Sequence, residues 1–429
     1  MRAVWTMTVL AVAQAAAGQE NVERLTLAQA TERALAASPT VGRLRAGERA
    51  AEADARAAAA GRLPQVELQA GYARQSDVPE IVVGGQTIFP NLPDNYRTRL
   101  AATVPLFTGG RLERALDSAR LERTASAGDL DAGRRDLVYE TTAAYWSLAT
   151  ARRSEEVLRE ALSAYDAHLK DAQNRADVGL AARNEVLAVQ VERDRAELSL
   201  LRASESVAVA EADLLRLLDL PAGTRVETAE ALDGAAAQAD DGLAEGAIAA
   251  RPERAAALAR AEAAEARIRG ERGARLPQVA LAAGVDYANP NRKILPPSAE
   301  WDHTWDVGVS LTWNVFDGGR TNAAVARAEA RAAAAREQLA DVDRRIRLEV
   351  TRAQLGRRTA GARVALSDRS LESARENRRV AADRYRAGVI PSSELLDAEV
   401  ALLRAGLDRT DAQASLRLSD AALVRATGR

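Results

Sequence analysis

Four segments of about ten residues alternate between apolar and polar positions. In residues 305–315, for example, Trp305, Val307, Val309 and Leu311 alternate with polar or small residues. The other segments are residues 65–73, 97–107 and 278–287. Because successive side chains of a β-strand point to opposite faces, the pattern predicts four strands, each with one apolar and one polar face.

Each predicted strand has the length that a tilted strand needs to cross a bilayer. Aromatic residues lie near the strand ends, as expected at membrane interfaces: Tyr72, Tyr287, Trp305 and Trp313. Four strands cannot close a membrane barrel, whereas three chains together would supply about twelve. A soluble sandwich with one solvated face is the alternative that the alternation leaves open.

Two long stretches of helical pattern follow the strand pairs. From Arg111 to about Ala176 the chain has no proline and few glycines, and residues 320–387 repeat this. At ~1.5 Å per residue, each helix would be on the order of 100 Å long. Apolar residues often recur every three or four positions between charged ones, which predicts a coiled-coil-like seam with a solvated face. Further helices are predicted at 26–62, 184–219, 252–275 and 392–426.

The chain is two tandem copies of one unit. The segment Val104–Arg111 (VPLFTGGR) returns as Trp313–Arg320 (WNVFDGGR). Three pairs of residues lie 209 positions apart: Phe107 and Phe316, Gly179 and Gly388, and Glu185 and Glu394. A fixed-period repeat of this kind governs the prediction of the whole fold.

The repeat predicts four regions along the chain. They are a signal peptide at 1–17, a first repeat at 18–220, a linker or equatorial segment at 221–250, and a second repeat at 251–429. The first repeat contains strands at about 65–75 and 97–107 and a long hairpin at about 110–219. The second contains strands at about 278–288 and 304–316 and a long hairpin at about 319–427.

Proline and glycine mark the changes between helix and strand. Pro64 and Pro277 end the helices that enter the strands, because proline cannot continue a helix and its predecessor favours extended backbone. The return turns from strand to helix are predicted at Gly109, Gly110, Gly318 and Gly319. Glycine supplies the backbone freedom that such a turn needs.

The first 17 residues have the pattern of a secretory signal. Arg2 supplies the positive start, a short apolar core follows, and Ala15–Ala17 fits a cleavage site. An uncleaved anchor is the alternative, although the apolar core is too short to span a bilayer. After this segment no apolar run predicts a transmembrane helix.

Composition excludes several classes of function. The chain has no cysteine, and its only histidines, His168 and His303, lie far apart, which argues against disulfides, cysteine nucleophiles and histidine metal sites. A net charge of −2 argues against a general nucleic-acid binder. Nothing resembles a phosphate-binding loop, a catalytic triad or a metal cluster, so we expect no enzyme activity and no cofactor.

The two Phe-x-Gly-Gly-Arg strand exits, the paired long helices and the two glycine turns resemble the TolC-like outer membrane efflux protein family. The resemblance covers about residues 25–428. It implies a homotrimer in outer membrane lipid, with a twelve-stranded β-barrel continued by a tube of helices across the periplasm. It also implies a passive exit duct of a tripartite efflux pump or type I secretion system, working with a periplasmic adaptor protein and an inner-membrane transporter.

The resemblance further implies adaptor contacts at the hairpin tips. The matching residues are Arg175, Val178, Gly179 and Leu180 in the first copy and Arg384, Gly388 and Val389 in the second. Glycine at these positions is also what an ordinary helix cap requires, and the two interpretations are compatible.

The family closes its periplasmic end with polar residues just past these turns. By position they correspond to Asn184, Glu185, Tyr385, Glu394 and Asp397. Glu394 and Asp397 share a helix face, so threefold repetition would place six carboxylates around the aperture and favour cations there. The family often has a basic residue where this chain has Ile390, and a solvated helix face is the alternative role for the carboxylates.

Two other classes of function remain in competition with a channel. A periplasmic coiled-coil adaptor or scaffold should have a single hairpin and soluble β-domains, which the duplicated hairpin and the bilayer-length strands do not match. An outer membrane enzyme would need buried acid pairs, whereas the carboxylates found here lie on apparent helix surfaces. The sequence does not identify the exported molecule.

Overall fold

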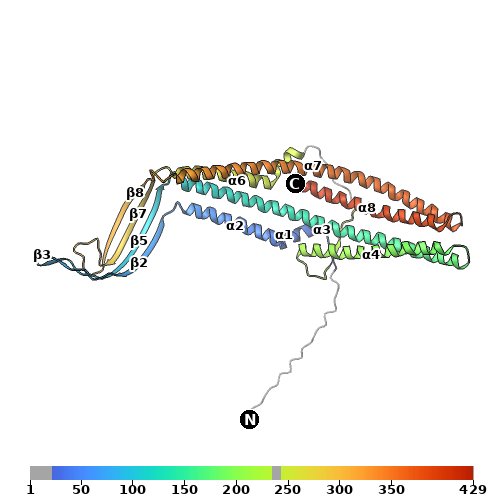
Figure 1. The fold of residues 1–429 in the computed structure, drawn as a ribbon, viewed down its shortest axis with the longest axis horizontal. Coiled ribbons are helices and arrows are strands. Elements are labelled where there is room, and N and C mark those ends of the chain that lie inside the picture. Colours follow the sequence, from blue (N-terminus) through green and yellow to red (C-terminus); the bar gives the residue numbers. More distant parts are fainter. Residues whose placement is uncertain (1–21, 234–242, 429) are drawn as a thin grey trace, which may run out of the picture. The chain divides into compact units, whose positions relative to one another are not determined.

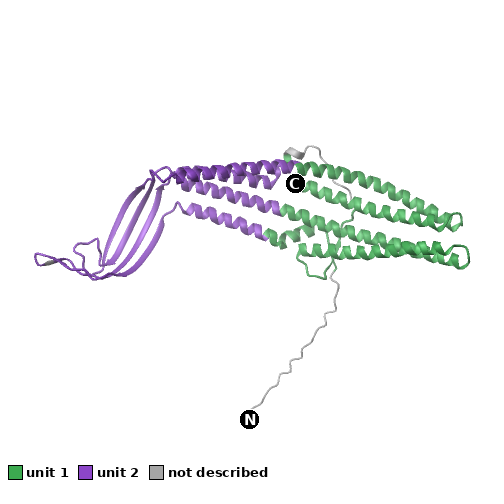
Figure 2. Ribbon diagram, viewed as in Figure 1, with its two compact units in different colours: residues 1–41, 134–247, 348–429 green, residues 42–133, 248–347 purple. Residues whose placement is uncertain are grey.

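A computed structural model describes residues 22–233 and 243–428. The predicted signal peptide at 1–17 and part of the predicted linker lie outside these residues. The chain forms two compact units, shown in Figure 2. Unit 1 comprises residues 1–41, 134–247 and 348–429, and unit 2 comprises residues 42–133 and 248–347. Each unit therefore takes segments from both halves of the sequence.

Helices make up most of the fold, and the four longest form two pairs of equal length. The long helices α3 (Arg111–Asp177) and α7 (Arg320–Arg386) each have 67 residues. Their partners α4 (Arg183–Leu218) and α8 (Ser392–Thr427) each have 36. The remaining helices are α1 (Leu27–Ala37), α2 (Pro39–Ala60), α5 (Leu243–Ala250) and α6 (Pro252–Gly273). No helix in the described part of the chain has an apolar stretch long enough to cross a membrane.

Unit 2 contains a four-stranded antiparallel sheet in the order β2-β5-β7-β8 (Figure 1). Its strands are β2 (Gln65–Arg74), β5 (Asp94–Phe107), β7 (Gln278–Asn289) and β8 (Asp302–Thr312). The central pair, β5 and β7, joins the first half of the sequence to the second. Strands β2 and β8 form the two edges of this sheet, which is open in the single chain.

The structure differs from the predicted elements at several places. The last strand ends at Thr312 rather than near 316, because Thr312 pairs with Gln278 and the partner strand begins there, directly after Pro277. The predicted helix at 26–62 is two helices, α1 and α2, because Pro39 cannot donate the backbone hydrogen bond that would continue α1. The loop between β2 and β5 also carries a short hairpin of β3 (Ile81–Val83) and β4 (Gln86–Phe89).

A buried hydrogen-bond cluster organises the middle of unit 1. Strand β1 (Val22–Leu25) pairs in parallel with β6 (Arg225–Thr228). The fully buried hydroxyl of Tyr145 donates to the Leu25 carbonyl at 3.0 Å and contacts the Glu230 carboxylate. Glu230 also accepts from the Leu27 backbone amide at 3.0 Å. Burial, together with the hydrogen bond to Glu230, raises the pKa of Tyr145 to about 12.

Candidate functional sites in the two units

One face of the sheet in unit 2 is apolar and exposed. The strand register places Leu68 of β2 beside Leu100 of β5, Leu100 beside Val285 of β7, and Val285 beside Trp305 of β8. All four side chains are exposed, and so are Val307, Val309 and Leu311 further along β8. An exposed apolar face of this extent is energetically unfavourable in water and marks a surface that meets lipid or another protein.

Aromatic rings gather at both ends of this sheet. At the loop end, Tyr72, Tyr96, Trp301 and Tyr287 form a chain of ring contacts with centroids 4.9–5.7 Å apart. At the helix end, Trp313 donates from its indole nitrogen to the Arg275 carbonyl at 3.1 Å while more than half of its surface stays exposed. Aromatics with one polar and one apolar side are typical of the two interfaces of a membrane.

The opposite face of the sheet is polar and carries an ion cluster. Arg99 on β5 bonds to Asp286 on β7 and makes two 3.0 Å bonds to Asp306 on β8. It reaches β8 because Gly284 lies between them: a Cβ at Gly284 would be 2.6 Å from a guanidinium nitrogen of Arg99. Lys293 in the following loop bonds to both carboxylates, at 2.7 and 2.8 Å. The sheet therefore separates an apolar face from a charged one.

The predicted glycine turns join this sheet to the long helices. Gly109, Gly110, Gly318 and Gly319 all have positive φ, between 65° and 88°. In the second copy Asp317 accepts from the Gly319 and Thr321 backbone amides at 3.0 and 2.9 Å and so caps α7. The hydrogen bond from the Thr321 hydroxyl, together with those from the two backbone amides, lowers the pKa of Asp317.

Both hairpin tips in unit 1 end in the same helix-capping motif. The Leu180 amide donates to the Arg175 carbonyl at 2.8 Å and the Gly179 amide donates to Ala176 at 3.0 Å. In the second tip, Val389 donates to Arg384 at 2.9 Å and Gly388 donates to Tyr385 at 3.0 Å. This pattern is the Schellman motif, which requires a left-handed residue; Gly179 has φ +78° and Gly388 has φ +72°.

The capping motif leaves apolar side chains exposed at both tips. In most Schellman motifs the residue after the glycine packs back on the helix. Here Leu180 is 78% exposed and Val389 is 65% exposed, and Val178 in the first tip is also exposed. Each tip therefore presents an apolar side chain on a rigid turn, as a docking surface requires.

The five residues predicted at the aperture divide into two groups. Asn184, Glu394 and Asp397 are exposed and Glu185 is half-buried. Tyr385, also predicted at the aperture, is 5% exposed in the single chain and packs in the tip core with Ile390 and Leu395. The Arg175 guanidinium covers its ring at 4.3 Å, and burial raises the pKa of Tyr385. The buried Ile390 also explains why no basic side chain stands at that position.

A buried polar contact joins the two hairpins near the tips. His168 on α3 contacts the Glu399 carboxylate at 2.9 Å and the Ser392 hydroxyl at 3.0 Å, both on α8. All three side chains are buried. A histidine so enclosed by two partners holds the hairpins together. In the described residues, no group of three or more His, Cys, Asp or Glu side chains is placed to hold a metal ion.

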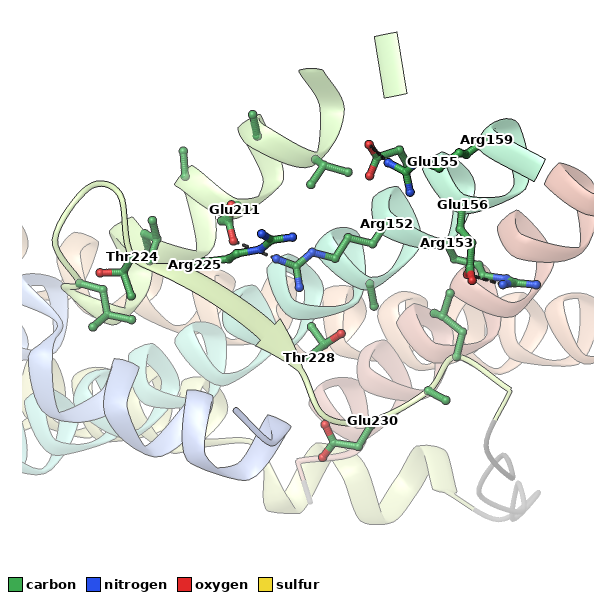
Figure 3. Close-up of a pocket in the computed structure, with 18 of the residues that line it drawn as sticks. Arg152, Arg153, Glu155, Glu156, Arg159, Glu211, Thr224, Arg225, Thr228 and Glu230 are labelled. Atoms are coloured by element: carbon green, nitrogen blue, oxygen red, sulfur yellow. Dashed lines mark hydrogen bonds and ion pairs between the residues drawn. The ribbon is translucent and has the colours of Figure 1, made fainter. Parts of the chain in front are cut away.

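A charged pocket of about 1250 Å³ lies in unit 1 between α3, α4 and the segment around β6. Figure 3 shows Arg152 and Arg225 directed toward Glu211. Glu211 accepts from Arg152 at 2.9 Å and from the Val226 backbone amide at 2.9 Å, and Arg159 pairs with Glu155 at 2.8 Å. Because these charges are used in pairs within the protein, the pocket wall ties α4 to β6 rather than presenting free ligands.

The sequence pattern did not predict the ion cluster around Arg99 or the hydrogen-bond cluster around Tyr145. Alternation placed Arg99, Asp286 and Asp306 on the polar faces of their strands, but it did not indicate that β5 lies beside β7. Tyr145 and Glu230 are 85 positions apart in sequence. Nothing in the local pattern distinguishes either of them from residues on a solvated helix face or in a loop.

The sequence matches the model of the outer membrane efflux protein family over residues 30–219 and 243–429. The curated outer membrane efflux protein BepC of Brucella suis biovar 1 (strain 1330) is 24% identical over 335 residues, covering 76% of this chain and 70% of that protein.

Solved structures show the same fold. The outer membrane protein VceC of Vibrio cholerae superposes with a TM-score of 0.82 at 23% identity, over 94% of this chain and 96% of that chain. The open-state MtrE outer membrane channel of Neisseria gonorrhoeae gives a TM-score of 0.79 at 21% identity, over 94% of this chain and 88% of that chain.

Proposed function

Because the chain belongs to the outer membrane efflux protein family, we propose that it is the exit duct of a tripartite efflux pump or a type I secretion system. The family membership confirms the resemblance found in the sequence and the predicted location in the outer membrane. The family is one of channel proteins rather than enzymes. The duct conducts passively, and an inner-membrane transporter supplies the energy.

The observation that carries this proposal is the two-faced open sheet of unit 2. Its exposed apolar face suits lipid and its charged face suits water, while the unpaired edges β2 and β8 would be unfavourable in hydrocarbon. Pairing β8 of one copy with β2 of the next satisfies both edges. Three copies would then form the twelve-stranded barrel expected from the sequence.

The duplicated elements support two tandem structural repeats as the building plan of each protomer. The helices α3 and α7 begin 209 positions apart, and so do α4 and α8. We propose that residues 18–220 and 251–429 are these repeats and that 221–250 connects them. Each repeat contributes two strands of the barrel and one helical hairpin to the duct.

The mass of the detergent-extracted complex from outer membranes tests this function. We expect three copies per particle, and we expect the particles to open ion-conducting pores in a planar bilayer. A single copy recovered from the soluble periplasmic fraction would contradict the channel and would favour a periplasmic scaffold instead.

We further propose that Asn184, Glu185, Glu394 and Asp397 surround the periplasmic aperture. Three of the four side chains are exposed and Glu185 is half-buried, and Glu394 and Asp397 lie in the first two turns of α8. The buried Tyr385 would support this ring from the tip core rather than line it.

The double variant Glu394→Ala, Asp397→Ala is expected to weaken block of the pore by multivalent cations. Six carboxylates would be lost from the trimer, which removes the local negative potential that concentrates cations. We expect the half-blocking concentration of hexaamminecobalt(III) to rise at least about tenfold in single-channel recordings.

A matched control for this variant is Asp408→Ala with Asp411→Ala. These two aspartates are also exposed and three positions apart on α8, so the control removes the same charge elsewhere on the helix. Equal weakening of the block in both double variants would show that general surface charge, and not an aperture, controls the block.

A further inference from the structure

The polar face of the sheet has an open pocket of about 670 Å³ at its loop end, formed by β2, β5, β7 and the loop after β7. Its wall carries three cations, Arg97, Arg292 and Lys293, but one carboxylate, Asp286. The other acidic residues of the strands on this face, Asp302, Asp306 and Glu67, are not part of the pocket lining. Asp306 is bonded to Arg99 and Lys293, and Glu67 accepts from the Gln69 amide at 2.9 Å.

The carboxylate in the pocket is already saturated. Asp286 has a side chain that is 4% exposed, and it accepts from Arg97 at 3.0 Å, from Lys293 at 2.7 Å and from Arg99. Arg97 remains 62% exposed beside Asp286, and Lys293, which also bonds to Asp306, remains 45% exposed, so Arg97, Arg99 and Lys293 share two carboxylates. Positive charge on the pocket wall is therefore in excess of its internal partners.

Arg292 adds a cation that is oriented by neutral groups. Its guanidinium donates to the Asn95 side-chain oxygen at 2.8 and 3.1 Å and to the Gln75 side-chain oxygen at 2.6 Å. Amide oxygens fix the direction of the guanidinium without neutralising it. In the described residues, its second terminal nitrogen has no protein hydrogen-bond partner, so one edge of the planar donor group is open.

We propose that this pocket binds carboxylate or phosphate groups of the molecules that leave through the duct. This proposal rests on the proposed function, because that function makes the polar face of the sheet the wall of the channel. Arginine side chains match the oxygen pairs of both groups with parallel hydrogen bonds. A membrane lipid is the wrong occupant, because lipid meets the opposite, apolar face of the same sheet.

The pocket therefore gives the outer end of the duct a preference for anionic cargo. An anionic group held by Arg97 and Arg292 satisfies the excess charge of the wall and leaves the Asp286 and Asp306 cluster unchanged. Three copies in the trimer would place three such pockets around one channel. Weak binding at several sites suits a conduit, because the cargo must be able to leave each site again.

Tripolyphosphate block of the reconstituted full-length trimer tests this inference. We expect tripolyphosphate added on the side of the loops to block the current, and Arg292→Gln to raise its half-blocking concentration at least about tenfold. The double variant Arg97→Gln, Arg292→Gln should nearly abolish the block and shift the reversal potential in a salt gradient toward cations. Arg292→Lys should give an intermediate block, since it keeps the charge but loses the planar donor pair.

Arg74→Gln is the matched control for Arg292→Gln. Arg74 ends β2 at the same end of the sheet, in the alternation of the apolar face, and pairs with Asp94 at 3.3 Å. An equal change in Arg74→Gln and Arg292→Gln would overturn the pocket in favour of a general surface potential. Pores that conduct but show no tripolyphosphate block would overturn this inference alone, whereas trimers that form no pores would overturn the proposed function with it.

Discussion

The double variant Leu180→Asp, Val389→Asp is expected to reduce export to the level of a gene deletion while trimers still assemble. Both side chains are among the most exposed apolar groups of the tips, so the folded chain loses little when they change. At an adaptor interface, however, each aspartate would bring an unpaired charge into an apolar contact. A penalty of about 3 kcal/mol corresponds to about 100-fold weaker docking.

Replacing the chromosomal gene with the variant and measuring susceptibility to a panel of exported dyes and detergents checks this expectation. The conservative variant Leu180→Met, Val389→Leu keeps the tips apolar and should retain export. The mass of the extracted complex must remain that of a trimer in both. Normal export by the aspartate variant with intact trimers would show that the tips are not part of the adaptor interface.

The second large effect is expected at the first strand-to-helix turn. Gly109 has φ +65°, and a Cβ at this position would be 2.3 Å from the Gly273 carbonyl oxygen and 3.0 Å from the Leu276 side chain. Because the nearest atom belongs to backbone, it cannot move aside cheaply. Gly109→Ala should therefore suffer both left-handed backbone strain, about 1–2 kcal/mol, and the separation of two packed backbones.

Gly318 allows the backbone strain to be measured without the steric contact. It occupies the same turn in the other copy with φ +67°, but a Cβ there meets nothing within 4 Å. Gly318→Ala should cost the backbone strain alone, whereas Gly109→Ala should lower the free energy of unfolding at least about twice as much. Thermal denaturation of the extracted trimers measures the difference. Equal melting temperatures would show that the Gly109 and Gly273 backbones are free to separate.

Local sequence predicted the position of most elements. Alternation located the four strands because a one-residue shift would exchange their apolar and polar faces. Proline and glycine located the turns because Gly109 and Gly318 need positive φ and Pro64 cannot continue a helix. The prediction from local sequence was wrong at Trp313 to Phe316. These residues still alternate in part, but β7 has no residue left to pair with them, because Thr312 already pairs with its first residue, Gln278.

Local sequence also predicted only part of the candidate sites, because it does not indicate which distant residues pack together. The turn at Gly179 was predicted because a helix cap depends on adjacent residues. The position of Tyr385 in the core was not, because its burial depends on Arg175 and His168 from α3. Likewise, the cation excess beside Asp286 arises only when the loop after β7 brings Arg292 to Asn95 at the start of β5 and Lys293 to Asp286 on β7.

The sequence by itself determined the four long strands, the long helices and the turns, since each depends on side-chain period or backbone freedom within a few residues. Only the tertiary structure decided that β5 pairs with β7, that His168 joins the two hairpins, and that Gly284 lets Arg99 reach Asp306. These features join residues about 170 to 230 positions apart. Burial and electrostatics act on distance in space, which no local pattern records.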